Sequence, residues 1–533
     1  MYKVMLRDNM SPRAKEILEA TGQIQVVVDN DKATNDPKVL ADLIGEFDGL
    51  GIRSGTKVTA PIFEKAGNLK VVARAGIGVD NVDVNEASSR GIVVMNAPGG
   101  NTLTTAEHAI SMLLSLARNI PQATASMRAG QWEKKAFMGV EIGGKTLGII
   151  GLGQIGRVVS SRAQGLGMKV IATDPYITKE AAASLGVELV LMDDLLAKAD
   201  FITLHVPRLE ETKNLIRSAT LQKMKKGVRL INCARGDVVN LDDLAEALSK
   251  GHVAGAALDV FPQEPPDYSA PIFKHPNVIF TPHLGASTGE AQEKVAEMIA
   301  RQMVSYFLEG IIINAVNFPS IPMETMAKLR LHLDLAEQMG SMIGQMVRQP
   351  CDMNITYSGY VTEFDTRVLT HAALKGLLSC FTDRPVNFVN APYMAKAKGI
   401  KVQETNQLQA VEYTNLIRID LPGVKDDLNE LWGTVFANKY ERIVRIGKIF
   451  LDAIPQGPMI LVQNVDRPGV IGNIGMILGK HGVNIAHFQL GRTKDKEQAI
   501  CTVNLDTPVG EHILHEIRAL PHVLSARYVV FGG

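Results

Sequence analysis

The chain has 533 residues, too many for a single hydrophobic core, and its length predicts about three or four domains. Its 56 Lys and Arg residues balance 56 Asp and Glu residues, so no net charge steers it to nucleic acid or to an anionic membrane. It lacks a long apolar run and a signal-peptide core, so we expect a cytoplasmic protein. The four cysteines lack metal-ligand spacing, and we expect reduced thiols and no metal site.

Residues 1–97 alternate apolar strands with helical segments and predict a parallel α/β unit. Arg53 and Arg74 each follow one of its strands. Ligands of open α/β sheets bind beyond the C-terminal ends of the strands, so the two arginines could converge on one anion. The alternative is two surface arginines in exposed salt bridges. The strands are expected at residues 3–6, 24–28, 49–52, 70–73 and 92–95.

Residues 98–290 predict a second unit, a doubly wound parallel sheet of the Rossmann type with six strands. A helix over 104–119 precedes its first strand. A helix over 290–310 is expected to return to the first unit and to end in a strand at 311–314. The second domain would then be inserted into the first, with 291–317 as the return segment. The six strands are expected near residues 147–150, 168–174, 201–205, 229–232, 255–258 and 277–280.

A glycine-rich turn follows the first strand of this second unit. Gly151, Gly153 and Gly156 have G-x-G-x-x-G spacing and precede a helix whose N-terminus can hold a pyrophosphate. Asp174 ends the next strand, 18 positions after Gly156, where a carboxylate can accept from ribose hydroxyls. No arginine follows it to receive a 2′-phosphate, which favours NAD over NADP. We expect the cofactor to contact Gly151, Gly153, Gln154, Ile155, Gly156 and Asp174.

Three later strands of this unit end in residues suited to the oxidation of a 2-hydroxy acid. Arg235 can grip a substrate carboxylate and polarise the reacting oxygen. His283 can take the hydroxyl proton, and Glu264 can orient its imidazole. Each residue alone has a structural explanation, but the combination favours catalysis. Asp259 is a weaker candidate that would meet the nicotinamide or support Arg235. Cys233, Asp259, His283 and Gly285 are expected on the cofactor side.

The segments GLGQIGR, NCARGD, LDVFPQEPP and TPHLGAST resemble the D-isomer-specific 2-hydroxyacid dehydrogenases. Within that family, RAGIGVDNVD, NAPGGNTLTTAEH and IPQATASMRAGQWEKKAFMG resemble the D-3-phosphoglycerate dehydrogenases. The resemblance implies NAD as cofactor, 3-phosphoglycerate as substrate and a flavodoxin-like substrate domain. It implies that the substrate is bound by Arg53, Arg74, Gly76, Asn101 and Arg235.

The same resemblance implies subunit contacts. Trp132 and residues 134–137 are similar to the family's dimer-contact segment, which implies a homodimer or homotetramer. Lys134 or Lys135 would then reach the substrate phosphate of the neighbouring subunit. Ile77 stands where some members of the family have Thr, so a side-chain hydrogen bond to the cofactor is lost there.

The last third of the chain is not required for catalysis. Residues 456–533 predict a βαββαβ unit that resembles the ACT domain, an amino-acid-binding module. Asn464, Asp466 and Asn484 are candidates to bind L-serine as an effector, and the alternative is a domain that only joins subunits. Residues 318–455 resemble the α+β intervening domain of long-form relatives. There Lys439, Arg442 and Arg445 form either an anion site or a solvated face.

Two alternatives to 3-phosphoglycerate oxidation stay open. The first keeps the chemistry and changes the substrate to another small D-2-hydroxy or 2-oxo acid, such as hydroxypyruvate, glyoxylate or 2-hydroxyglutarate. The second is a scaffold protein that senses NAD without useful turnover. The pair Arg53 and Arg74 and the ACT-like tail argue against the first alternative. The lack of a nuclear-targeting basic cluster and the ACT-like tail argue against the second.

Overall fold

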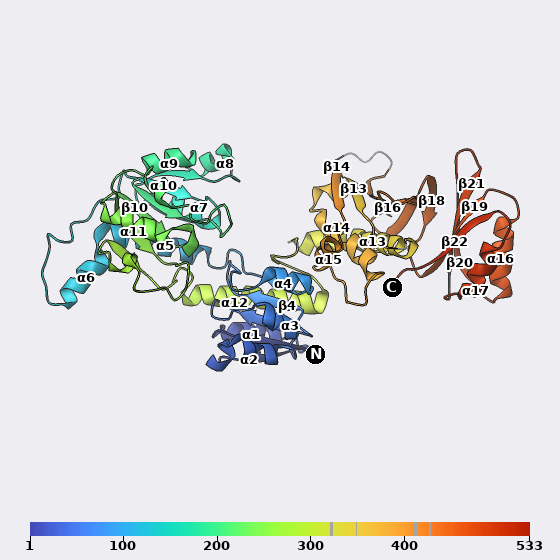
Figure 1. The fold of residues 1–533 in the computed structure, drawn as a ribbon, viewed down its shortest axis with the longest axis horizontal. Helices are drawn as coiled ribbons and strands as arrows, with labels where there is room; N and C mark the ends of the chain where they lie inside the picture. The colour runs from blue at the N-terminus through green and yellow to red at the C-terminus, as the bar shows by residue number, and fades with distance from the viewer. Residues whose placement is uncertain (320–322, 348, 409–412, 426–427, 533) are drawn as a thin grey trace.

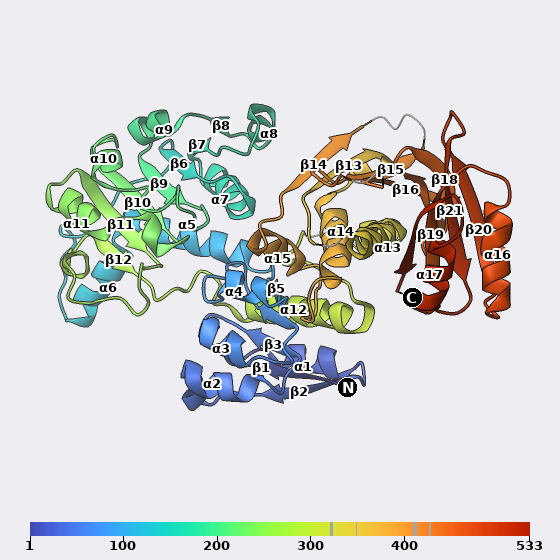
Figure 2. The same cartoon turned by 45° about the vertical axis from the view of Figure 1, so that its right-hand side comes forward.

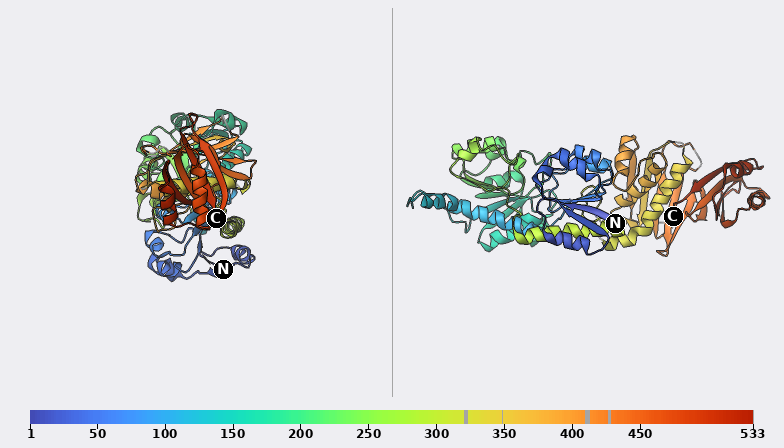
Figure 3. Two further views of the ribbon diagram at one scale, coloured as in Figure 1. Left: turned by 90° about the vertical axis from the view of Figure 1, so that its right-hand side faces the viewer. Right: turned by 90° about the horizontal axis from the view of Figure 1, so that it is seen from below.

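The computed structural model describes residues 1–319, 323–347, 349–408, 413–425 and 428–532. The strands of these residues form four sheets, which lie in a row along an elongated molecule (Figure 3). The second sheet of the sequence lies at one end of the row and the C-terminal sheet at the other. The N-terminal sheet lies between the second sheet and the C-terminal half (Figure 1).

The first sheet is parallel, as the sequence predicts, and its strand order is β2-β1-β3-β4-β5. Its alternation of short apolar strands and helices buries both faces, which is typical of flavodoxin-like folds. Its strands are β1 (Tyr2–Leu6), β2 (Ile24–Val28), β3 (Gly49–Ile52), β4 (Val71–Arg74) and β5 (Val93–Met95). Its helices are α1 (Pro12–Glu19), α2 (Pro37–Ile44), α3 (Ala60–Lys65) and α4 (Val84–Ser89), with the 3₁₀ helix η1 (Lys32–Asn35).

Helix α12 (Gly289–Glu309) returns the chain to this first sheet (Figure 2). Its buried residues Ile299 and Met303 share one core with Val4 and Leu6 of β1. The strand expected at 311–314 is wrong. The chain instead passes β5 with an isolated antiparallel bridge between Met95 and Ala315, because Asn314 adopts a φ of 52°, which interrupts an extended strand.

The second sheet is parallel, with the order β12-β11-β10-β9-β6-β7-β8. It has seven strands rather than the expected six, because the two-residue edge strand β8 is too short to show a periodic pattern. The strands are β6 (Thr146–Ile150), β7 (Lys169–Thr173), β8 (Glu188–Leu189), β9 (Phe201–Leu204), β10 (Val228–Asn232), β11 (Val253–Leu258) and β12 (Val278–Phe280).

The helices of this second unit cover both faces of its sheet, and α6 projects at its far end (Figure 1). Helices α5 and α7 pack against each other on one face through small and aliphatic residues such as Ala109 and Val159. The helices are α5 (Thr102–Arg118), α6 (Ile120–Arg128), α7 (Gln154–Gly165), α8 (Lys179–Ser184), α9 (Met192–Lys198), α10 (Ser218–Leu221) and α11 (Leu241–Ser249), with η2 (Gly236–Val238) and η3 (Pro271–Lys274).

The third sheet is mixed, with the order β14-β13-β15-β16-β17-β18. Its core is continuous with that of the first sheet, and Asn387 Nδ2 donates to the carbonyl of Gly91 at 2.7 Å. The strands are β13 (Met353–Gly359), β14 (Val402–Gln407), β15 (Asn415–Asp420), β16 (Glu430–Phe436), β17 (Tyr440–Ile446) and β18 (Ile449–Ala453). The helices are α13 (Met323–Met346), α14 (Arg367–Ser379) and α15 (Ala391–Ala397), with η4 (Tyr360–Glu363).

The fourth sheet is antiparallel, in the order β20-β21-β19-β22, with both helices on one face (Figure 2). The predicted βαββαβ order is confirmed. The elements are β19 (Pro458–Val465), α16 (Val470–Lys480), β20 (Ile485–Arg492), β21 (Gln498–Leu505), α17 (Glu511–Arg518) and β22 (Val523–Val530). The domain boundaries drawn from the sequence stay predictions. Among the described helices, none combines the length and apolar character needed to span a membrane.

Candidate active site

A cavity of about 380 Å³ lies between the first and second sheets, at the C-terminal ends of their strands. Open α/β sheets bind ligands at this edge. Arg53 and Arg74 reach it from the first sheet, and Arg235 and His283 from the second. Other predicted residues that line it are Gly76, Asn101, Gly153, Gln154, Ile155, Cys233, Asp259 and Gly285. Gly151, Gly156, Asp174 and Glu264 are not among the described residues that line it.

Glu264 nevertheless belongs to the site through His283. Glu264 Oε2 lies 2.8 Å from His283 Nδ1, and Glu264 Oε1 accepts from the amide of Phe261 at 3.2 Å. Burial works to raise the pKa of Glu264, but the hydrogen bond and charge of His283 outweigh it, and the pKa lies below its ordinary value. With Nδ1 engaged, Nε2 is the nitrogen of His283 that can exchange a proton with a ligand.

Asp259 holds the loop that carries His283. Its Oδ1 accepts from the Thr281 hydroxyl and the Leu284 amide, and its Oδ2 accepts from the Gly285 amide at 2.9 Å. The Asp259 carbonyl also accepts from the amide of His283, which adopts an uncommon φ of 56°. Burial works to raise the pKa of Asp259, but hydrogen bonds from His108, Thr281 and the Leu284 amide lower it overall. Asp259 therefore fixes the loop. The carboxylate that pairs with Arg235 is that of Asp80, whose Oδ2 lies 2.9 Å from Arg235 Nε, and not that of Asp259.

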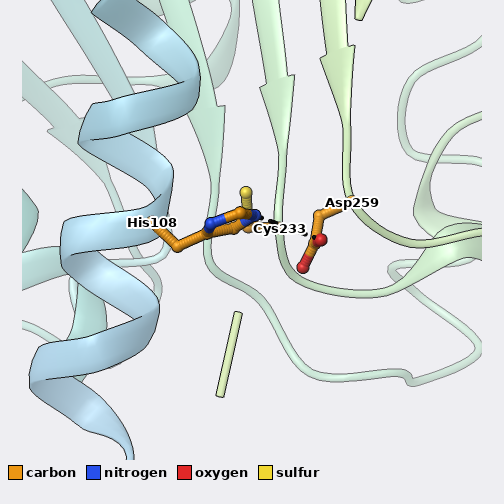
Figure 4. A group of neighbouring side chains, drawn as sticks. All are labelled: His108, Cys233 and Asp259. Atoms are coloured by element: carbon orange, nitrogen blue, oxygen red, sulfur yellow. Dashed lines mark ion pairs between the residues drawn. The ribbon is translucent and has the colours of Figure 1, made fainter. Parts of the chain in front are cut away.

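His108, Cys233 and Asp259 bring a nitrogen, a sulfur and an oxygen within 4.8 Å of one another (Figure 4). Burial and the nearby Asp259 raise the pKa of Cys233 well above its ordinary value, so its thiol is neutral in the protein without a bound ion. His108 Nε2 and Asp259 Oδ1 are 3.1 Å apart, and the carboxylate already accepts two backbone amides. The cluster is explained by the hydrogen bonds that hold the loop.

The substrate end of the cavity contains buried polar groups without partners. Among the described residues, Arg74 Nε and Asn101 Oδ1 are buried and make no hydrogen bond. Burial, together with the charges of Arg235 and Arg53, lowers the pKa of Arg74 to about 10. Unpartnered buried groups are costly, so a ligand that supplies an anion and a donor fits this end of the cavity.

The cofactor end has the backbone geometry of a dinucleotide turn. Gly151 has a φ of 94°, and a Cβ on Gly156 would lie 2.2 Å from the Gly151 carbonyl oxygen, so no side chain fits there. Gly153 faces open space at the N-terminus of α7. Asp174 Oδ2 accepts from the amide of Leu152 at 2.8 Å, which places the carboxylate beside this turn. These residues fit a pyrophosphate at the helix N-terminus and a ribose at Asp174.

The predicted effector residues do not all come together in this chain. Asn464 and Asp466 line a second cavity of about 440 Å³ in the fourth domain. Asp466 pairs with Arg492 at 3.2 Å there. Asn484 is not among its lining residues, and its Nδ2 donates to Asp506 at 2.6 Å.

The three basic residues of the third sheet have local partners. Arg442 pairs with Asp452 at 3.0 Å, and Arg445 pairs with Glu430 at 3.2 Å. Lys439 lies over the ring of Tyr440. These contacts favour a solvated, ion-paired face over an anion site.

Comparisons with known proteins agree with this geometry. The chain matches three families: the NAD-binding domain of D-isomer-specific 2-hydroxyacid dehydrogenases over 110–285, the D-3-phosphoglycerate dehydrogenase intervening domain over 328–447, and the ACT domain over 459–522. It is 40% identical to D-3-phosphoglycerate dehydrogenase of Bacillus subtilis (strain 168) over 531 residues, which is 99% of each chain. The chain belongs to the D-3-phosphoglycerate dehydrogenase family.

A second relative and a solved structure are also similar to this chain. The chain is 40% identical to D-3-phosphoglycerate dehydrogenase of Methanocaldococcus jannaschii over 525 residues, 98% of each chain. The crystal structure of the TT0316 protein from Thermus thermophilus matches with a TM-score of 0.54 and 32% identity, over 59% of this chain and 99% of that one. As in other family members with this NAD-binding domain, the cofactor is NAD.

Sequence reasoning missed two residues that support the site. Asp80 pairs with Arg235, and His108 contacts Asp259. Asp80 stands in the turn RAGIGVDNVD, four positions after Gly76, and a carboxylate in a strand-end turn is a signal that could have been used. His108 lies in a helix whose apolar spacing indicates only burial, so no sequence signal marked it.

Proposed function

We propose that this protein is an NAD-dependent oxidoreductase that converts D-3-phosphoglycerate to 3-phosphohydroxypyruvate, the first step of L-serine biosynthesis. The observation that carries the proposal is the meeting of Arg53, Arg74 and Arg235 beside the His283–Glu264 pair. The substrate's carboxylate and phosphate together carry about three negative charges near neutral pH, a match for three guanidinium groups. The two full-length relatives are D-3-phosphoglycerate dehydrogenases, which supports the same reaction.

The residues divide the chemistry between them. Arg235 holds the carboxylate and polarises the oxygen on C2 as it becomes a carbonyl, while Arg53 and Arg74 take the phosphate end. His283 Nε2 removes the hydroxyl proton, and the Glu264 carboxylate stabilises the imidazolium that forms. NAD, when bound, supplies the acceptor for the hydride that leaves C2. In the reverse direction His283 returns the proton to the carbonyl oxygen.

The test follows NADH absorbance with 3-phosphoglycerate, D-glycerate and 2-hydroxyglutarate. We expect preference for 3-phosphoglycerate, and a loss of at least about 100-fold in kcat/KM in Arg235→Ala. NADH binding and Tm should be retained by that variant, which separates a catalytic loss from unfolding. Turnover of the unphosphorylated acids alone would overturn the substrate assignment, and NADH binding without turnover would indicate a scaffold.

The proposal includes a homo-oligomer. Trp132 and Met138 are 72% and 81% exposed in the segment that follows α6, and large apolar side chains so exposed in one segment indicate a contact surface. Lys134 lies over the Trp132 ring in the same segment. Analytical ultracentrifugation should give a dimer or a tetramer, and Trp132→Ala should shift it toward monomer. A monomeric wild type would contradict this part.

The proposal also includes L-serine as an effector. Asn464 and Asp466 offer an amide and a carboxylate in one cavity, and Asn484 joins them if a second ACT-like domain pairs with the first. Titration calorimetry with L-serine should show binding that is lost in Asp466→Ala. If both proteins release the same heat, or the wild type releases none, L-serine does not bind at Asp466, and this domain would serve only as a contact between subunits.

A further inference from the structure

An ion pair connects the two walls of the active-site cavity. Asp80 lies in the turn between β4 and α4 of the first sheet, whereas Arg235 follows β10 of the second, and both line the cavity. Arg235 Nε donates to Asp80 Oδ2 at 2.9 Å. We propose that Asp80 is a positioning residue that aims Arg235 at the substrate carboxylate and sets the anion affinity of the cavity. The inference rests on the proposed function, which gives the carboxylate grip to Arg235.

Two hydrogen bonds fix the guanidinium plane of Arg235. Besides the bond to Asp80, its Nη1 donates to the carbonyl of Ala234 at 2.7 Å. Gly78 closes the side beside Nη2, because a Cβ there would lie 2.1 Å from that nitrogen. Among the described residues, Nη2 has no hydrogen-bond acceptor and Nη1 keeps a second N–H group, so a carboxylate can accept from both nitrogens. Without its bond to Asp80, the long side chain regains rotamers in which this fork points elsewhere.

Asn81, the residue after Asp80, holds the backbone of Arg53, which follows β3 of the first sheet. Asn81 Nδ2 donates to the carbonyls of Arg53 at 2.7 Å and Thr56 at 2.6 Å. The dipeptide 80–81 therefore holds the backbone of Arg53 and the side chain of Arg235. It sets the separation of two cationic grips, and a substrate with an anionic group at each end must match that separation.

Asp80 also sets the charge of the cavity. Among the described residues that line it, the carboxylates are Asp80 and Asp259. Asp259 is 0% exposed and is engaged by the amides of Leu284 and Gly285. Asp80 is thus the carboxylate available to balance the arginines. Its charge opposes the lowering of the pKa of Arg74 that burial and Arg235 cause.

These two effects are separable by substitution. Asp80→Asn keeps an oxygen that accepts from Arg235 Nε but removes one negative charge, whereas Asp80→Ala removes both. The orientation of the Arg235 guanidinium toward the substrate carboxylate should be lost in Asp80→Ala but kept in Asp80→Asn. Anion affinity should rise in the asparagine variant, because one repulsive charge is gone from a cavity that binds anions.

The first experiment measures kcat and KM for 3-phosphoglycerate and for NAD in the wild type and both variants. We expect Asp80→Ala to lose about tenfold in kcat/KM for 3-phosphoglycerate, with KM for NAD changed less than about twofold. Asp80→Asn should keep kcat within about threefold of the wild type and show a lower KM for 3-phosphoglycerate. Asp193→Ala is the matched control, because Asp193 forms an exposed pair with Lys223 at 2.8 Å, and it should behave as the wild type.

The second experiment does not depend on turnover. Oxalate contains the carboxylate that Arg235 would grip, and its binding to the NADH complex is measured by NADH fluorescence. Asp80→Ala should bind oxalate about tenfold more weakly, and Asp80→Asn at least as tightly as the wild type. If the wild type fails to oxidise 3-phosphoglycerate but the oxalate result holds, the proposed function fails and the role of Asp80 stands.

Two results would overturn the inference. In the first, Asp80→Ala keeps both kcat/KM and oxalate affinity within about twofold of the wild type. In the second, Asp80→Asn loses as much as Asp80→Ala and both have an equally lowered Tm, which is the behaviour of a structural residue. If Asp80 were only structural, Asp80→Asn would not keep the kcat and the oxalate affinity that Asp80→Ala loses.

Discussion

Arg74 is expected to lower the folding stability of the ligand-free protein although it helps to bind the substrate, and the variant Arg74→Met tests this. The fall in its pKa from 12.5 to about 10 corresponds to a cost of about 3 kcal/mol for keeping the charged form in the folded protein. Methionine keeps a similar apolar stem and removes the buried charge, so the variant should be more stable. Allowing for lost packing, we expect a gain of about 1–2 kcal/mol.

The sign of the pH dependence follows from the direction of the shift. The unfolded chain holds the Arg74 proton more tightly than the folded chain, so the penalty is present at every pH below about 10. The gain from Arg74→Met should therefore be constant between about pH 6 and 9. Arg208→Met is the control, since Arg208 is 57% exposed and pairs with Asp237, and no gain is expected from it.

The assay is thermal unfolding with and without 3-phosphoglycerate at constant ionic strength. The ligand-free variant should have a higher Tm than the wild type, and its Tm should respond less to 3-phosphoglycerate. Its kcat/KM should fall at least about 30-fold, the usual cost of removing one partner of a buried charge pair. A ligand-free Arg74→Met that unfolds earlier than the wild type, or an unchanged shift with 3-phosphoglycerate, would refute the reasoning.

Three further predictions concern the catalytic pair, the cofactor turn and a buried histidine. Glu264→Gln should lower kcat about 100-fold with little change in KM for NAD, because the charge that stabilises the His283 imidazolium is lost; unchanged kcat would contradict the pair's role. Gly156→Ala should raise the Kd for NADH at least about tenfold in a fluorescence titration, because its Cβ would overlap the Gly151 carbonyl oxygen. Burial lowers the pKa of His205 to about 4, so the unfolded chain binds this proton first and stability should fall as pH drops from about 6.5 to 4. In urea unfolding, the free energy of unfolding of His205→Gln should fall less than that of the wild type, by up to about 3 kcal/mol at pH 4. An equally steep fall in both proteins would exclude His205 as the cause of the loss of stability.

The sheets and the catalytic pair could be predicted from the sequence for a physical reason. Parallel strands buried on both faces are short continuous apolar runs, and residues just after them must gather at one edge of the sheet. Glu264 and His283 follow neighbouring strands β11 and β12, so their 2.8 Å contact follows from strand order. The turn at Gly151 was predictable because its positive φ requires glycine.

Short strands and strand orders that depend on distant pairing partners could not be predicted from the sequence. Strand β8 has two residues and depends on its pairing with β7. The segment 311–314 is largely apolar, but the left-handed φ of Asn314 leaves only an isolated bridge to β5. The third sheet joins β13 to both a parallel and an antiparallel neighbour, and no periodicity in one strand indicates that order.

Asp80 and Asp259 show where strand-end reasoning stops. Both carboxylates follow strands and both line the cavity, so their positions in the sequence do not decide which of them pairs with Arg235. The choice depends on what else each carboxylate meets. Asp259 follows β11, the strand next to β10, but three donors of the 281–285 loop surround it. Asp80 is 155 positions from Arg235 and follows a strand of another sheet. The partner of Arg235 is therefore set by the closure of two sheets on each other, a distance that local sequence does not encode.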